Sequence, residues 1–196
     1  MRLPGSGADR TPVSKVTLDL YAEAILDNIT DPVVLVGHSM AGFPISLVAE
    51  RAPEKIARLV YVCAYVPVSG QSLADMRRAS PLQPLREAIV TARDRQSFTF
   101  RPEMVAAKFY HDCPPGTFDY ALLHLTPQPI APQATPVNLG GNFARVPKRY
   151  IRCTDDRAIP PVYQATMSAG LADRVDLACS HSPFFAMPET LAEMLR

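Results

Sequence analysis

Two kinds of hydropathy pattern alternate along much of the chain. Apolar residues recur every three or four positions from 17 to 29, and Thr17 can cap the first turn, so this stretch is predicted to form an amphipathic helix. Residues 33–36 form an uninterrupted apolar run of mostly β-branched side chains, which is typical of a strand buried on both faces of a parallel sheet. A second helix is predicted over 40–51, with Pro44 early enough to lie in its first turn.

The same alternation returns in the last third of the chain. Further buried strands are predicted over 56–65, 149–153 and 175–179, and helices over 162–169 and 188–196. Strands that alternate with helices are typical of an α/β fold with a mostly parallel sheet. We see no internal repeat.

Residues 67–147 interrupt this alternation. The segment holds 11 of the 20 prolines, and its length exceeds that of an ordinary connection between neighbouring strands. Short helices are predicted within it over 85–91, 103–110 and 117–125. We therefore expect a core built from residues 1–66 and 148–196, with 67–147 inserted as a cap or lid.

Composition and charge exclude several classes of function. The 196 residues carry a formal net charge of +1, and the basic residues are scattered, which argues against a nucleic-acid partner. The apolar runs are much shorter than the roughly 20 residues that cross a bilayer, so no membrane partner is expected. Without an apolar leader at the start, we expect a soluble protein in the cytoplasm.

The cysteines do not follow a metal-binding pattern. Four cysteines are widely spaced and form no CxxC pair, at positions 63, 113, 153 and 179. This spacing argues against a zinc site and against a disulfide scaffold. We expect reduced, mostly buried thiols, and neither a metal nor an organic cofactor.

A serine lies where the first strand gives way to the second helix. The sequence Gly-His-Ser-Met-Ala-Gly at 37–42 fits a nucleophile elbow, in which a strained turn exposes the serine and requires small neighbours two positions away. Gly37 meets this requirement, and Ala41 replaces the usual glycine. Ser39 is then the candidate nucleophile, and the Met40 N–H is a candidate oxyanion donor. The alternative is an ordinary serine at a helix N-terminus.

A nucleophilic serine needs a base and an acid that orients it. His181 follows the last strand, whereas His111 and His124 fall in the insertion and His38 is expected to face away from the serine. The alternative for His181 is an ordinary histidine in a surface loop. Two acids, Asp155 and Asp156, follow the strand over 149–153, where a parallel sheet places its sites; either could instead only cap the next helix. Composition does not separate them.

Seven short motifs are spread over nearly the entire chain. They are Leu-Pro-Gly-Ser-Gly at 3–7, Gly-His-Ser-Met at 37–40, Tyr-Val-Pro and Gly-Gln-Ser within 65–72, Tyr-His-Asp-Cys-Pro at 110–114, Cys-Thr-Asp-Asp-Arg-Ala-Ile-Pro at 153–160 and His-Ser-Pro-Phe-Phe at 181–185. With these motifs the chain resembles the plant methylesterase and hydroxynitrile lyase group of the α/β-hydrolases, and especially its bacterial esterase relatives. The resemblance implies an α/β-hydrolase fold and puts the catalytic acid at Asp156.

The resemblance also bears on the reaction. Hydroxynitrile lyases of this kind carry a lysine directly after the catalytic histidine, to hold the cyanide, and this chain has Ser182 there. We therefore favour a serine carboxylesterase of small or aromatic methyl-type esters over a lyase. A catalytically silent module that only binds a small molecule is the third alternative. Apolar side chains that could line the substrate pocket are Phe109, Tyr110, Leu122 and Phe184.

Residues 1–16 differ from the start of this family. Its members begin with strands and a His-Gly loop that supplies a second oxyanion donor, so this chain is expected to be truncated relative to them. Loss of one such donor lowers kcat roughly 10²- to 10³-fold. In the family the missing strand pairs with the one before Ser39, which would leave 33–36 as an unpaired apolar edge. We expect a homo-oligomer that pairs through this edge, or partial replacement of the lost strand by residues 1–16.

Overall fold

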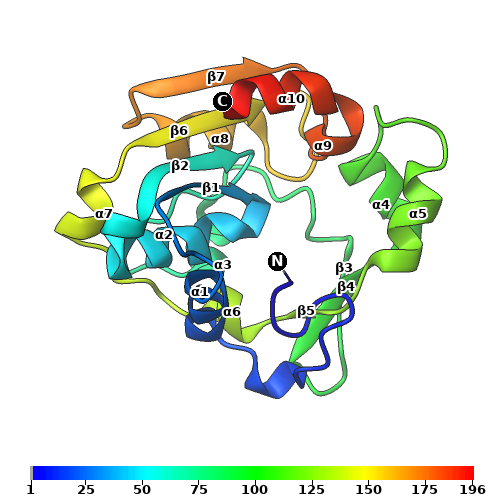
Figure 1. Cartoon of the computed structure of the whole chain (residues 1–196). Helices are drawn as coiled ribbons and strands as arrows, with labels where there is room; N and C mark the ends of the chain where they lie inside the picture. The colour runs from blue at the N-terminus through cyan, green and yellow to red at the C-terminus, as the bar shows by residue number, and fades with distance from the viewer. Residues whose placement is uncertain (1) are drawn as a thin grey trace.

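A four-stranded parallel sheet lies at the centre of the computed structural model, which describes residues 2–196 (Figure 1). The strands follow the order β1-β2-β6-β7, and each pairs in parallel with its neighbour. Their bounds are Val33–His38 (β1), Ile56–Val62 (β2), Lys148–Cys153 (β6) and Asp173–Leu177 (β7). This confirms the predicted α/β fold, with β2 ending three residues earlier than its predicted range.

Helices pack on both faces of this sheet. They are α1 (Leu18–Leu26), α2 (Gly42–Arg51), α8 (Pro161–Ser168) and α10 (Pro188–Leu195), all close to their predicted ranges. Thr17 caps α1 as predicted, because its side-chain oxygen accepts the Leu20 N–H at 3.0 Å. Along β2, Leu59 and Tyr61 pack with α1 and α2, while Val60 and Val62 pack on the other face with Leu191 of α10. The middle strands are thus buried on both faces.

Strand β1 departs from the prediction of a strand buried on both faces. Val34 is 43% exposed and Val36 40% exposed, and the burial alternates along the strand. The register pairs Val36 with Val60, so both side chains point to the face that α10 covers. The apolar cluster around α10 includes Val60 but neither exposed valine, which leaves that face of the edge strand open.

Residues 67–147, the predicted insertion, contain a second, antiparallel sheet. Its strands are β3 (Ile89–Thr91), β4 (Ser97–Phe100) and β5 (Gln128–Pro129). The helix predicted over 85–91 is therefore wrong: residues 85–88 form hydrogen-bonded turns, and the β-branched residues of β3 pair with β4. The other two predicted helices are present as α4 (Pro102–Phe109) and α5 (Thr117–His124). Both lie to one side of the central sheet in Figure 1.

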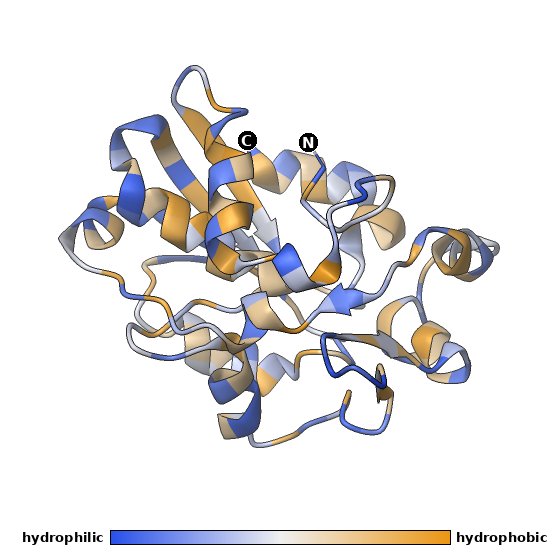
Figure 2. Cartoon of the chain, turned by 90° about the horizontal axis from the view of Figure 1, so that it is seen from below, coloured by the Kyte–Doolittle hydropathy of each residue, from blue (hydrophilic) through white to orange (hydrophobic). Residues whose placement is uncertain are grey.

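Shorter helices complete the chain. They are α3 (Leu73–Ala79), α6 (Ala131–Ala134), α7 (Gly141–Arg145) and α9 (Pro183–Ala186), together with 3-10 turns at Val13–Lys15, Ser39–Ala41 and Pro53–Lys55. Figure 2 shows apolar residues in the central strands and the helices beside them, with hydrophilic residues more common on the outer turns. Within residues 2–196, no helix combines the length and the apolar character that crossing a membrane requires.

Candidate active site

Ser39 lies in a strained turn between β1 and α2. Its φ of 56° is in the left-handed region, which non-glycine residues rarely adopt. The turn is tight: a Cβ added at Gly37 would come within 2.6 Å of Ile45, and one added at Gly42 would collide with the Tyr65 carbonyl oxygen. The structure therefore requires a residue without a Cβ at Gly37, as predicted, and also at Gly42. Tyr65 N–H also donates to the Ser39 carbonyl, which fixes the turn against the end of β2.

His181 and Asp156 form a buried pair. His181 Nδ1–H donates to Asp156 Oδ2 at 2.7 Å, and the two residues are only 3% and 4% exposed. A neutral imidazole that donates through Nδ1 keeps a free lone pair on Nε2. This is the tautomer that can accept a proton from a serine hydroxyl.

Asp156 is held by a full set of donors. Its Oδ1 accepts the N–H groups of Ala158 and Ile159 at 2.7 and 2.9 Å, and its Oδ2 accepts Gln164 Nε2–H at 2.9 Å in addition to the histidine. Asp155 is exposed and takes no part in this network. Of the two acids that composition leaves open, the structure brings Asp156 to His181, and Asp156 also caps the turn before α8, as the alternative interpretation expected.

His38 does not face away from the site, contrary to the expectation from sequence. Its Nε2 lies 2.7 Å from the carbonyl oxygen of His181, and the two imidazole rings lie 4.6 Å apart between centroids. Burial, together with electrostatic repulsion between the two imidazoles, lowers the pKa of His38 to about 3, so the His38 ring is neutral at pH 7. A neutral ring facing a carbonyl must donate, which assigns the proton of His38 to Nε2.

A thiol reaches the same carbonyl oxygen. Cys63 Sγ lies 3.5 Å from the His181 oxygen, so this acceptor receives two donors from the ends of two neighbouring strands. The ligand atoms of His38, Cys63 and His181 lie within 4.8 Å of one another, a spacing that could hold a metal ion. The chemistry of the donors does not fit, because Cys63 keeps its proton in the hydrogen bond to the His181 oxygen, whereas a metal binds the thiolate. Burial also raises the pKa of the Cys63 thiol to about 11, which disfavours the thiolate that a metal needs.

Residues of the insertion also form hydrogen bonds with the loop that carries His181. Asp112 Oδ2 accepts the Ser180 N–H at 2.7 Å, and Ser180 Oγ donates to the Phe109 carbonyl at 3.2 Å. Partial burial raises the pKa of Asp112, but the hydrogen bonds from Ser180 outweigh it and the net pKa is lowered. The segment after α4 therefore positions the histidine loop through a charged acceptor.

A cavity of about 340 Å³ joins these groups. Its lining includes Ser39, Met40 and His181, together with three of the residues predicted for the pocket, which are Phe109, Tyr110 and Phe184. Leu122 does not line it, which corrects the fourth prediction. Leu122 is 40% exposed because α5 turns Ala121 inward and Leu122 outward, while Leu125, one turn further along, reaches the cavity.

Three residues that position the site were not predicted from the sequence. Gln164 is fully buried on α8 and holds Asp156; a glutamine on the apolar face of an amphipathic helix is a usable signal for such a role. Asp112 lies in one of the quoted motifs, but only the fold shows which atom it binds. Cys63 carries no pattern that distinguishes it from an ordinary core thiol.

Comparison with known proteins places this geometry in a family. The chain matches the family described as "Alpha/beta hydrolase family" over residues 1–194. A pyrethroid hydrolase of Sphingobium wenxiniae is 29% identical over 98% of this chain and 72% of its own length. Methylesterase 7 of Arabidopsis thaliana is 27% identical, with 98% of this chain and 82% of the relative covered. The chain spans 61% of the length of a chloroplastic methylesterase relative from the same plant.

A solved structure agrees with these relatives. The crystal structure of a pyrethroid hydrolase from Sphingobium faniae superposes with a TM-score of 0.86 at 25% identity, over 96% of this chain and 79% of that one. The relatives are named as hydrolases and esterases, as the sequence motifs led us to expect. The chain belongs to the alpha/beta hydrolase family.

Proposed function

We propose that this chain is a serine carboxylesterase that cleaves small or aromatic, methyl-type esters through an acyl-enzyme. The observation that carries the proposal is the buried hydrogen bond between His181 and Asp156, at a cavity that Ser39 also lines. Relatives named as methylesterases support ester hydrolysis as the reaction.

In the first half of the reaction, His181 Nε2 takes the hydroxyl proton of Ser39 while Oγ attacks the ester carbonyl. Asp156 keeps its negative charge and stabilises the imidazolium that forms. The Met40 N–H stabilises the oxyanion, because the elbow directs the backbone after the serine toward the reacting carbon. His181 then returns the proton to the alcohol that leaves, and the acyl group remains on Ser39.

In the second half of the reaction, water hydrolyses the acyl-enzyme. His181 takes a proton from the water, the hydroxide attacks the acyl carbon, and Ser39 Oγ leaves with the proton that the imidazolium returns. Atoms and charge therefore balance without a metal or a redox partner. The position after the catalytic histidine is Ser182, so no cation is available there to hold a cyanide, which weighs against the lyase alternative.

A fluorophosphonate probe and an ester panel test the proposal together. We expect the probe to label the wild type at Ser39, and labelling to be lost in Ser39→Ala and in His181→Ala. A panel of p-nitrophenyl and methyl esters should be hydrolysed by the wild type and not by Ser39→Ala. His124→Ala, on the exposed end of α5, is the matched control and should be labelled normally. A folded wild type that is neither labelled nor active would favour the silent binding module, and cyanide release from a cyanohydrin without ester hydrolysis would favour the lyase.

A further inference from the structure

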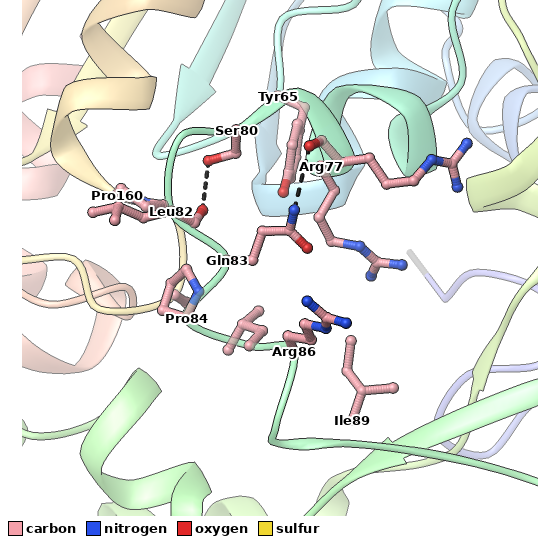
Figure 3. A pocket seen from close by; sticks show the side chains of 12 residues that line it. Tyr65, Arg77, Ser80, Leu82, Gln83, Pro84, Arg86, Ile89 and Pro160 are labelled. Atoms are coloured by element: carbon pink, nitrogen blue, oxygen red, sulfur yellow. Dashed lines mark hydrogen bonds between the residues drawn. The ribbon is translucent and has the colours of Figure 1, made fainter.

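A second and larger cavity adjoins the candidate active site. It has a volume of about 610 Å³ and lies between the end of α3, the segment that follows it and the turn before α8 (Figure 3). Tyr65, Arg77 and Leu85 line both this cavity and the one that holds Ser39. The two cavities are therefore adjacent, with these three side chains between them.

The charged residues that line the second cavity are all positive. Three arginines line it, at positions 77, 78 and 86, and none of its lining residues is acidic. Arg78 is paired with Asp75 at 2.5 Å. Within residues 2–196, no carboxylate forms an ion pair with Arg77 or Arg86, so both guanidinium groups are available to an anion.

Of the three arginines, Arg77 has the surroundings that most favour binding of an anion. It is half-buried, and it lies close enough to Tyr65 for its charge to oppose the rise that burial causes in the pKa of the Tyr65 phenol. Tyr65 lines both cavities, and among the described residues its hydroxyl has no hydrogen-bond partner. A partly desolvated guanidinium without a counter-charge, next to an unused hydroxyl, favours an anionic oxygen as its partner.

The rest of the lining is apolar enough for a carbon chain. Leu82, Leu85 and Ile89 line the second cavity. Gln83 Nε2 donates one N–H to the Arg78 carbonyl at 3.3 Å, and its second N–H remains for a ligand. Figure 3 shows Tyr65, Arg77, Gln83 and Arg86 around the same space. A ligand with a short aliphatic segment that ends in a carboxylate matches this combination of apolar wall and donors.

We propose that the second cavity is a carboxylate subsite, so that the substrate is a monoester of a dicarboxylic acid, with the ester at Ser39 and the free carboxylate at Arg77 and Arg86. The inference rests on the proposed esterase function and adds the substrate class to it. Neutral esters fill only the apolar part of the site and lose the ion pairs, so they should be the poorer substrates.

A pair of matched esters tests this subsite. Mono-p-nitrophenyl glutarate and p-nitrophenyl pentanoate have acyl chains of equal length and differ in the terminal carboxylate. We expect the wild type to prefer the charged ester about tenfold or more in kcat/KM, since charge-assisted hydrogen bonds to an arginine are worth that much. Arg77→Gln should remove most of this preference, Arg86→Gln should remove a smaller part because its side chain is exposed, and Arg77→Lys should retain part of it. Arg145→Gln, an exposed arginine of α7 that lines neither cavity, removes the same charge and should leave the preference as it is.

Direct binding separates this inference from the proposed function. In a Ser39→Ala protein, calorimetry with monomethyl glutarate should show binding that Arg77→Gln weakens about tenfold, with circular dichroism and the melting temperature as checks on folding. A wild type that hydrolyses both esters with equal kcat/KM, and whose ratio the arginine variants do not change, overturns the subsite while the esterase function stands. Arginine-dependent binding in a protein that hydrolyses no ester overturns the esterase function while the subsite stands.

Discussion

At the scale of single residues, the carbonyl oxygen of His181 accepts two hydrogen bonds that the sequence motifs do not indicate. His38 and Cys63 donate to it from the ends of β1 and β2, while Asp156 holds the ring of the same histidine. From the sequence, His38 was expected to lie beside the serine and face away from it. Its role depends on a residue 143 positions away in the chain, and hydropathy and spacing cannot reveal a contact of that separation.

This arrangement predicts how stability depends on pH. The folded state keeps His38 neutral because its pKa is lowered to about 3, whereas in the unfolded chain the ring protonates near its ordinary value of 6.5. Between these values the unfolded state binds the extra proton, so the free energy of unfolding falls as the pH falls. From pH 7 to pH 5 we expect the wild type to lose about 1–2 kcal/mol more than His38→Phe, measured by urea unfolding.

The control for this measurement is another histidine. His124 is exposed and stacks on Tyr120, so His124→Phe should show the same pH dependence as the wild type. Identical pH slopes for the wild type and His38→Phe would contradict a neutral, desolvated His38.

At the scale of elements, the end of α4 is tied to the histidine loop. Asp112, three residues after α4, accepts the Ser180 N–H, and the Phe109 ring packs edge-on against the ring of His181 at 5.5 Å between centroids. The helix itself was predictable from its periodicity. Its contact with the loop after β7 was not, because it depends on where the insertion folds back over the sheet.

We expect the Asp112 contact to set the position of His181. Asp112→Ala removes the acceptor and should lower kcat about threefold to tenfold with little change in KM, as a lost hydrogen bond of about 1 kcal/mol predicts. Asp112→Asn keeps a carbonyl oxygen that can accept the same N–H and should recover most of the activity. Steady-state kinetics on one p-nitrophenyl ester measure both effects.

A second aspartate of the insertion provides the matched control. Asp94 also accepts a backbone N–H, that of Gln96 at 3.0 Å, but it lies in the turn between β3 and β4. Asp94→Ala should therefore leave kcat close to the wild-type value. Equal losses in the Asp94→Ala and Asp112→Ala proteins would mean that the insertion is only generally weakened.

At the scale of the whole molecule, the open edge at β1 is the main exposed feature of the central sheet. Within the described residues β1 pairs on one side only, with β2, and its two exposed valines form an apolar strip beside it. Unpaired strands with apolar side chains tend to pair with another chain. We therefore propose that two copies of this chain associate through Val34 and Val36.

Self-association should depend on concentration and on this edge. We expect light scattering to give a wild-type mass that rises above 21.5 kDa with concentration, and Val36→Lys to shift the protein toward the monomer, since an edge lysine opposes pairing. Val162→Lys changes a similarly exposed valine on α8 and should associate like the wild type. A wild type that stays at the monomer mass over the whole concentration range would contradict the proposed pairing.

The sequence by itself determined the parts of this protein that depend on local pattern. Apolar periodicity predicted α1, α2, α8 and α10, because the burial of one face of a helix leaves a repeat in the sequence. The Gly-His-Ser-Met motif predicted the elbow, because its strain demands small neighbours. The strands of the central sheet were also found, although the ends of β2 and β7 were displaced.

Only the tertiary structure decided the rest. The choice of Asp156 over Asp155, the turn of His38 toward His181 and the exclusion of Leu122 from the cavity all depend on residues far apart in the chain. Strand β3, which was predicted as part of a helix, forms because its backbone pairs with β4. Local patterns report which face of an element is buried, whereas these contacts depend on how the elements are brought together, and that information lies in no single stretch of sequence.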